Sequence, residues 1–145
     1  MAEVLLNQEQ IKEIIPHRAP FLLIDEVLEM EVGKRVVARK YIKADDFWFK
    51  GHFPEKPVTP GVLMVEMLAQ AGCGLHSAQP EFKGKIALFA GIDKAKFRRQ
   101  VVPGDVLDLE VEIIAQRGPV GVGKAIASVD GKRAVTCEIK FAVEQ

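Results

Sequence analysis

The sequence predicts an α+β domain in which one long apolar helix packs against an antiparallel sheet. The helix is indicated by an almost wholly apolar run from Val62 to Ala71. The sheet is indicated by the C-terminal half, where apolar and polar residues alternate as they do in strands with one buried face. Asp130-Gly131 lies between two such segments and is a strong hairpin signal, so we expect antiparallel strands.

The central helix is expected to span residues 60–77. Thr59 is a suitable N-cap and Pro60 fits the first helical position, whereas Pro80 is the next residue that would end a helix. Because the run is apolar on every side, we expect the helix to be buried. Polar residues interrupt the run, which therefore falls short of the roughly 20 apolar residues that a membrane span requires.

The other expected elements are short. A helix is expected at residues 8–15, with Asn7 as its cap and Pro16 at its end. The expected strands cover residues 21–30, 35–42, 85–92, 107–113 and 135–143. Because the chain has no internal repeat, low-complexity tract or linker, residues 1–145 are expected to form a single domain.

Composition excludes several classes of function. The 145 residues carry 20 basic and 20 acidic side chains, so no net field draws the chain to nucleic acid or to an anionic membrane. Cys73 and Cys137 do not make a secretory disulfide framework, and we expect both to be reduced core residues. The N-terminus lacks the length and the basic start of a secretory signal, so a cytoplasmic location is expected.

Glu66 is a candidate acid because it is the ionisable residue inside the apolar run. Burial of a carboxylate is costly and usually raises the pKa of the carboxyl group. Gln70 lies one helical turn further on, so its amide can bond the carboxyl group and fix its orientation. Helix chemistry alone leaves a second interpretation open, in which the two residues form a polar seam against another subunit or loop.

His52 is a candidate base in a stiff, proline-rich loop that leads directly into this helix. A lone histidine in a loop is often an ordinary surface residue, but here the loop brings it near the buried carboxyl group. Gly61 adds a third element, because a backbone N–H at a helix N-terminus can stabilise a developing oxyanion. Base, acid and oxyanion donor would then come from one short segment.

The other histidines do not indicate a metal site. His17, His52 and His76 share no ligand spacing, so no metal is expected. His17 lies in a proline-bounded turn and is expected to be structural or interfacial. His76 is placed to interact with carbonyl groups at the helix end.

Three separated blocks resemble one enzyme family over nearly the whole chain. The longest block is His52-Phe53-Pro54-x-x-Pro57-x-x-Pro60-Gly61-Val62-Leu63-x-x-Glu66-x-x-Ala69-Gln70. The others are Pro16-His17-Arg18-x-Pro20-Phe21-Leu22-Leu23-Ile24-Asp25 and Lys96-Phe97-Arg98-Arg99-x-Val101-Val102-Pro103-Gly104-Asp105. Together they resemble the (3R)-hydroxyacyl-acyl carrier protein dehydratases of the FabZ type, from bacterial-type fatty acid synthesis. Glutamate at position 66 resembles the branch that does not isomerise the double bond, whereas Thr59 departs from the methionine that the family more often has.

The resemblance implies a hot-dog fold, with a curved antiparallel sheet around the central helix, and a dehydration without a metal or redox cofactor. His52 would remove the α-proton and Glu66 would protonate the leaving hydroxyl group. The Gly61 N–H would polarise the thioester carbonyl, Gln70 would orient Glu66, and the Val58 carbonyl would hold the imidazole. The substrate would be carried on the phosphopantetheine arm of acyl carrier protein.

The resemblance also implies partners. Active sites would be shared between the two subunits of a homodimer, and three dimers would form a hexamer. A basic cluster, formed by Lys94, Lys96, Arg98 and Arg99, has two open interpretations: a docking surface for acyl carrier protein, or a solvated strand edge. Phe89 is a candidate for the lining of an acyl tunnel.

Two alternative functions remain open on the same fold. A hot-dog thioesterase would use a carboxylate to direct water onto the thioester carbonyl and would release a free thiol. A non-catalytic acyl-binding subunit would tolerate replacement of His52 or Glu66.

Overall fold

The computed structural model describes residues 4–77, 79, 85 and 87–143. Within these residues, six strands form one antiparallel sheet with the order β1-β2-β4-β5-β6-β3. The strands are β1 (Glu26–Glu31), β2 (Arg35–Tyr41), β3 (Ala87–Phe97), β4 (Val106–Arg117), β5 (Val120–Val129) and β6 (Lys132–Val143). The helical elements are α1 (Gln8–Ile11), the 3-10 helix η1 (Phe47–Lys50) and α2 (Gly61–Ser77).

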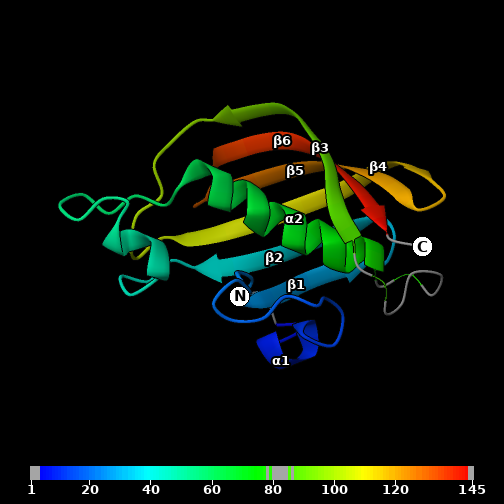
Figure 1. Ribbon diagram of the computed structural model, residues 1–145, viewed down its shortest axis with the longest axis horizontal. Coiled ribbons are helices and arrows are strands. Elements are labelled where there is room, and N and C mark those ends of the chain that lie inside the picture. The colour runs from blue at the N-terminus through cyan, green and yellow to red at the C-terminus, as the bar shows by residue number, and fades with distance from the viewer. Residues whose placement is uncertain (1–3, 78, 80–84, 86, 144–145) are drawn as a thin grey trace.

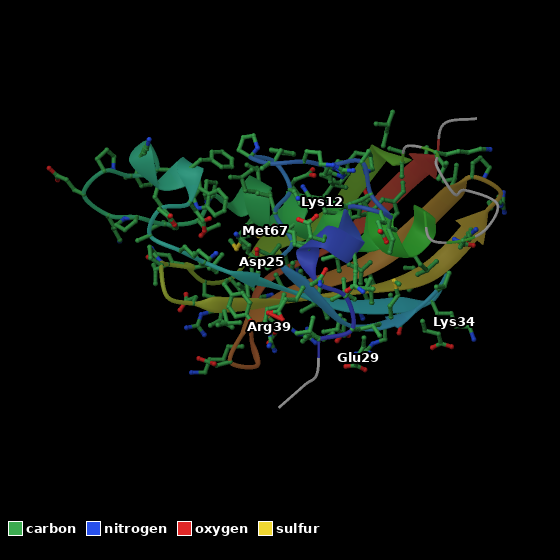
Figure 2. The ribbon with its side chains drawn as sticks, turned by 90° about the horizontal axis from the view of Figure 1, so that it is seen from below. Lys12, Asp25, Glu29, Lys34, Arg39 and Met67 are labelled. Carbon is green, nitrogen blue, oxygen red and sulfur yellow. The ribbon has the colours of Figure 1, made fainter. Side chains whose placement is uncertain are left out.

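Helix α2 lies along one face of the sheet, and α1 lies beside β1 (Figure 1). Met67 and Leu68 of α2 are fully buried, as are Leu107 and Leu109 of β4. Figure 2 shows Met67 on the helix side of the sheet, with Arg39 on the opposite side. This arrangement of a long apolar helix against an antiparallel sheet confirms the predicted α+β hot-dog fold.

The alternation of apolar and charged residues explains why the sheet has two different faces. On the face away from α2, charged side chains of neighbouring strands pair with one another. Arg35 lies 3.0 Å from Glu110, and Arg39 lies 3.1 Å from Asp108. The other face contributes the apolar side chains of the core.

The predicted hairpin is confirmed at the β5–β6 connection. Asp130 and Gly131 join the two strands and have φ angles of 51° and 78°. Two-residue turns that match the twist of the strands need positive φ at both positions, which Asp tolerates and Gly adopts freely. The central helix, predicted at residues 60–77, is also confirmed at Gly61–Ser77.

Two predicted elements are shorter in the structure. The strand predicted at 21–30 begins only at Glu26, because the backbone groups before it are used elsewhere: the Leu23 N–H bonds a glutamine side chain of α2, and the Phe21 N–H bonds the Arg18 carbonyl. The N-terminal helix ends at Ile11 rather than residue 15, although Asn7 caps it in a capping box as expected.

Two further predictions need correction. Strand β3 continues to Phe97, beyond the predicted end at residue 92, because its backbone pairs with β6. Most of its side chains are exposed, so the sequence pattern did not indicate this extension. Thr59 does not cap α2: its hydroxyl group is buried without a hydrogen-bond partner among the described residues. Its N–H instead donates to the Val101 carbonyl at 2.8 Å, while the Pro60 carbonyl accepts from Leu63 and Met64 at the helix start.

Within the described residues, no helix has both the length and the apolarity needed to cross a membrane.

Candidate functional site

The loop before α2 fixes the orientation of the His52 ring. The His52 N–H donates to the Trp48 carbonyl of η1 at 3.0 Å, and the His52 carbonyl accepts from the Val58 N–H at 3.1 Å. The ring atom Nδ1 lies 2.9 Å from the Val58 carbonyl oxygen. A carbonyl oxygen only accepts, so Nδ1 must carry the proton in this bond. The neutral ring therefore presents Nε2 as a proton acceptor.

A buried glutamine holds the Glu66 carboxyl group. Nε2 of Gln70 donates to Oε2 of Glu66 at 3.0 Å and to the Phe21 carbonyl at 2.8 Å. Oε1 of Gln70 accepts from the Leu23 N–H at 2.9 Å. Because both ends of this amide are bonded and the residue is only 1% exposed, Gln70 fixes one oxygen of Glu66.

Gly61 opens α2 at a position where a side chain would not fit. A Cβ atom there would lie 2.6 Å from Cδ1 of Phe97. The first N–H groups of a helix have no carbonyl partner within the helix and lie at its positive end. Gly61 thus lets the Phe97 ring pack closely against the start of α2.

His52 and Glu66 line different cavities of the chain. The first, the His52 groove, has a volume of about 590 Å³ and is lined by His52, Val58, Thr59, Pro60, Gly61, Val62, Met64, Phe97, Arg98, Arg99 and Gln100. The second, the Glu66 cavity, has a volume of about 240 Å³ and is lined by His17, Phe21, Glu66, Ala69, Ala87, Leu88, Phe89 and Phe141. One copy of the chain therefore groups His52 with Val58 and Gly61, but it does not bring His52 and Glu66 together.

His17 shares the Glu66 cavity, although its place in the sequence indicated only a structural or interfacial role. Its Nε2 atom lies 3.7 Å from Oε2 of Glu66. Burial lowers the pKa of His17, and nearby Arg18 adds to this effect, while Glu66 opposes it. The two residues are far apart in the sequence, and no spacing pattern could have indicated this contact.

The basic cluster lies at the end of β3 and in the residues that follow. Lys94, Lys96 and Arg98 line a hollow of about 190 Å³ together with Lys124 and Arg133. Lys94 is within 3.3 Å of Glu138 in this hollow. Arg98 also lines the His52 groove, as does Arg99. The cluster therefore extends from this hollow to the lining of the groove that contains the candidate base.

The described cysteine side chain does not contribute a nucleophile. Cys137 is a free, buried cysteine of β6, and burial raises the pKa of its thiol to about 11. The side chain of Cys73 lies outside the described residues, as does that of His76. Across the described part of the chain, no three His, Cys, Asp or Glu side chains are grouped as metal ligands.

Comparison with known proteins identifies the family of the chain. The model of the FabA-like domain family matches residues 15–138. A 3-hydroxyacyl-[acyl-carrier-protein] dehydratase FabZ from Clostridium novyi is 61% identical over 138 residues, which are 95% of this chain and 97% of the relative. The Staphylococcus aureus protein of the same name is 56% identical over 142 residues, which are 98% and 97% of the two chains.

Solved structures with low sequence identity show the same fold. A dehydratase heterocomplex from Xenorhabdus doucetiae superposes with a TM-score of 0.80 at 20% identity, covering 93% of this chain and 91% of the other. A mutant thioesterase from Pseudomonas aeruginosa superposes with a TM-score of 0.71 at 15% identity, covering 98% and 96%. The fold is thus shared by dehydratases and thioesterases, whereas the two relatives at 61% and 56% identity are dehydratases. The chain belongs to the FabA-like family, as a 3-hydroxyacyl-[acyl-carrier-protein] dehydratase of the FabZ type.

Proposed function

We propose that His52 and Glu66 are the base and the acid with which this chain converts a (3R)-3-hydroxyacyl-acyl carrier protein to the trans-2-enoyl-acyl carrier protein. The observation that carries this proposal is that each group is held by a specific bond: His52 by the Val58 carbonyl, and Glu66 by Gln70. Both bonds leave an atom available for proton transfer, Nε2 of the imidazole and Oε1 of the carboxyl group.

The reaction begins with removal of the α-proton by Nε2 of His52. The thioester carbonyl accepts a hydrogen bond from the Gly61 N–H, which stabilises the negative charge that develops on its oxygen. The Val58 carbonyl accepts from Nδ1–H and stabilises the imidazolium ion that forms.

The reaction continues as the electron pair of the broken C–H bond forms the double bond and the C–O bond to the hydroxyl group breaks. Glu66 donates its proton to the departing oxygen, which leaves as water. His52 then holds the additional proton and Glu66 has lost one, so proton exchange with solvent restores the starting state. These steps use only side-chain and backbone groups of the chain, and the acyl group is supplied on a phosphopantetheine arm.

The two catalytic groups of one site are proposed to come from different subunits of a homodimer. Within one chain they line separate cavities, so a second copy is needed to complete each site. Strand β3 lies at the edge of the sheet and exposes Leu88 and Ile92, while Val62 of α2 is 73% exposed. An exposed apolar edge of this kind is suited to pairing with another copy. Assembly of three dimers into a hexamer remains an expectation from the family resemblance.

Acyl carrier protein is the proposed partner of the basic cluster. Lys94, Lys96, Arg98 and Arg99 are exposed, and Arg98 and Arg99 reach the His52 groove. An acidic carrier surface and the phosphate of its pantetheine arm would both be attracted to these cations. The arm would then enter the groove close to Gly61. We expect this chemistry to take place in the cytoplasm.

The proposal is tested by ultraviolet absorption of the enoyl thioester in the presence of crotonyl-acyl carrier protein, with free thiol measured in the same sample. Hydration by the wild-type protein should remove the conjugated absorption without releasing thiol. His52→Ala and Glu66→Gln should each lower this rate by about a hundredfold or more. Thiol release would instead indicate a thioesterase, and unchanged activity in both variants would indicate that other residues carry the reaction.

A further inference from the structure

His17 and Glu66 lie close together in the lining of one cavity, although 49 positions separate them in the sequence. The distance from Nε2 of His17 to Oε2 of Glu66 is 3.7 Å, with side-chain exposures of 22% and 17%. The same carboxyl oxygen accepts the Gln70 bond. Glu66 therefore has two neighbours at Oε2, one of which is a fixed amide and the other a titratable ring.

The surroundings of His17 favour its uncharged form. The other residues that line the Glu66 cavity are apolar, namely Phe21, Ala69, Ala87, Leu88, Phe89 and Phe141. Nδ1 of His17 is buried and has no hydrogen-bond partner among the described residues. Arg18 is the cation next to it, and the Arg18 guanidinium bonds the backbone carbonyls of Lys12, Ile15 and His17. Burial is the largest effect and lowers the pKa of His17.

We propose that His17 is a positioning residue whose uncharged imidazole lets Glu66 keep the proton that the leaving hydroxyl group needs. This inference rests on the proposed role of Glu66 as the acid. A cation at the same place would stabilise the carboxylate form of Glu66 and so remove the proton donor. Reaction therefore requires both His52 and His17 to be uncharged, the first as a base and the second as a neighbour of the acid.

The proposal predicts the shape of the pH profile of kcat/KM. Because His17 must be uncharged for reaction, the rate of the wild type should fall more steeply toward acidic pH than that of a variant with an uncharged side chain at this position. His17→Gln is such a variant, and its rate at neutral pH should be lowered by about tenfold or less. His17→Lys places a cation beside Glu66, and its rate should be lower than that of His17→Gln by about a further tenfold or more.

The experiment measures kcat/KM from pH 5 to pH 10 with crotonyl-acyl carrier protein, for the wild type and both variants, after thermal unfolding has verified that each variant is folded. A steeper acidic limb in the wild type than in His17→Gln, together with the larger loss in His17→Lys, would support the proposal. An acidic limb with the same slope in the wild type and His17→Gln would overturn it, whether or not His17→Lys folds. A wild-type protein without hydration activity would overturn the proposed function itself, which is a different result.

Discussion

The side-chain amide of Gln70 lies 3.0 Å from Oε2 of Glu66 and 2.8 Å from the Phe21 carbonyl oxygen, so it joins the candidate acid to the segment before β1. This segment is irregular because the Leu23 N–H also donates to Gln70. Gln70 therefore contributes both to the irregular backbone at residues 21–23 and to the orientation of Glu66.

Replacement of Gln70 should reduce both activity and stability. Gln70→Ala leaves the Leu23 N–H and the Phe21 carbonyl without their partner, which should lower the free energy of unfolding by on the order of 3 kcal/mol. The freed carboxyl group should lower kcat by about tenfold, with less effect on KM. Denaturant unfolding and steady-state kinetics measure the two effects. Gln116→Ala, which removes an exposed bond to Gln79, is the matched control and should change neither.

Gly61 should be sensitive to a single methyl group. In Gly61→Ala the new Cβ would lie 2.6 Å from Cδ1 of Phe97, so the aromatic ring must move within the groove that both residues line. We expect kcat/KM to fall by about tenfold or more. Gly51→Ala, where no atom lies within 4 Å of the new Cβ, is the control. In a Phe97→Ala background the additional loss caused by Gly61→Ala should be smaller, and an equal loss in both backgrounds would contradict this explanation.

Charge reversal at Arg98 should weaken the use of the carrier-bound substrate. Arg98 lines both the basic hollow and the His52 groove, so Arg98→Glu places repulsion where we expect the acidic carrier to dock. KM for crotonyl-acyl carrier protein should rise by about tenfold, and the effect should shrink at high salt. KM for a crotonyl N-acetylcysteamine thioester, which has no phosphate and no carrier, should change much less. Lys34→Glu, in the exposed turn between β1 and β2, is the matched control.

Stability should depend on pH through His17. Burial lowers the pKa of His17 from 6.5, so below this pH the unfolded chain binds a proton that the folded chain does not yet bind. The free energy of unfolding should therefore fall as the pH decreases from 6.5 to the pKa of the folded protein, and the contribution should be constant below that. His17→Gln should show a smaller decrease between pH 7.5 and pH 5.5 in urea unfolding. An equal decrease in both proteins would exclude His17 as its source.

Sequence patterns predicted correctly those elements whose backbone conformation is determined by the residues of the element itself. The apolar run predicted α2, and Asp130-Gly131 predicted the β5–β6 hairpin. The alternation of apolar and polar residues did not predict the strand correctly where contacts with a distant segment determine the backbone conformation. Strand β3 extends to Phe97 because Lys96 and Phe97 pair with β6 beyond an irregularity in the register, although the side chains of residues 93–97 are all exposed and do not alternate like those of a half-buried strand.

The candidate site shows the same division. The i, i+4 spacing of Glu66 and Gln70 was sufficient to predict that their side chains could bond, and the bond is present in the structure. The position of His17 beside Glu66 depends on packing between segments that are distant in the sequence, so spacing could not predict it. The side chain of Thr59 is of a type that can cap a helix, but in the structure its hydroxyl group does not bond the start of α2 and its N–H donates to the Val101 carbonyl.

The most direct test of the account is to mix two inactive variants. If each site takes His52 from one subunit and Glu66 from the other, co-expression of His52→Ala with Glu66→Gln gives mixed dimers that contain one intact site. Random pairing makes about half of the dimers mixed, so the mixture should hydrate crotonyl-acyl carrier protein at about a quarter of the wild-type rate. A rate no higher than that of either variant alone would contradict a shared site built from these two residues.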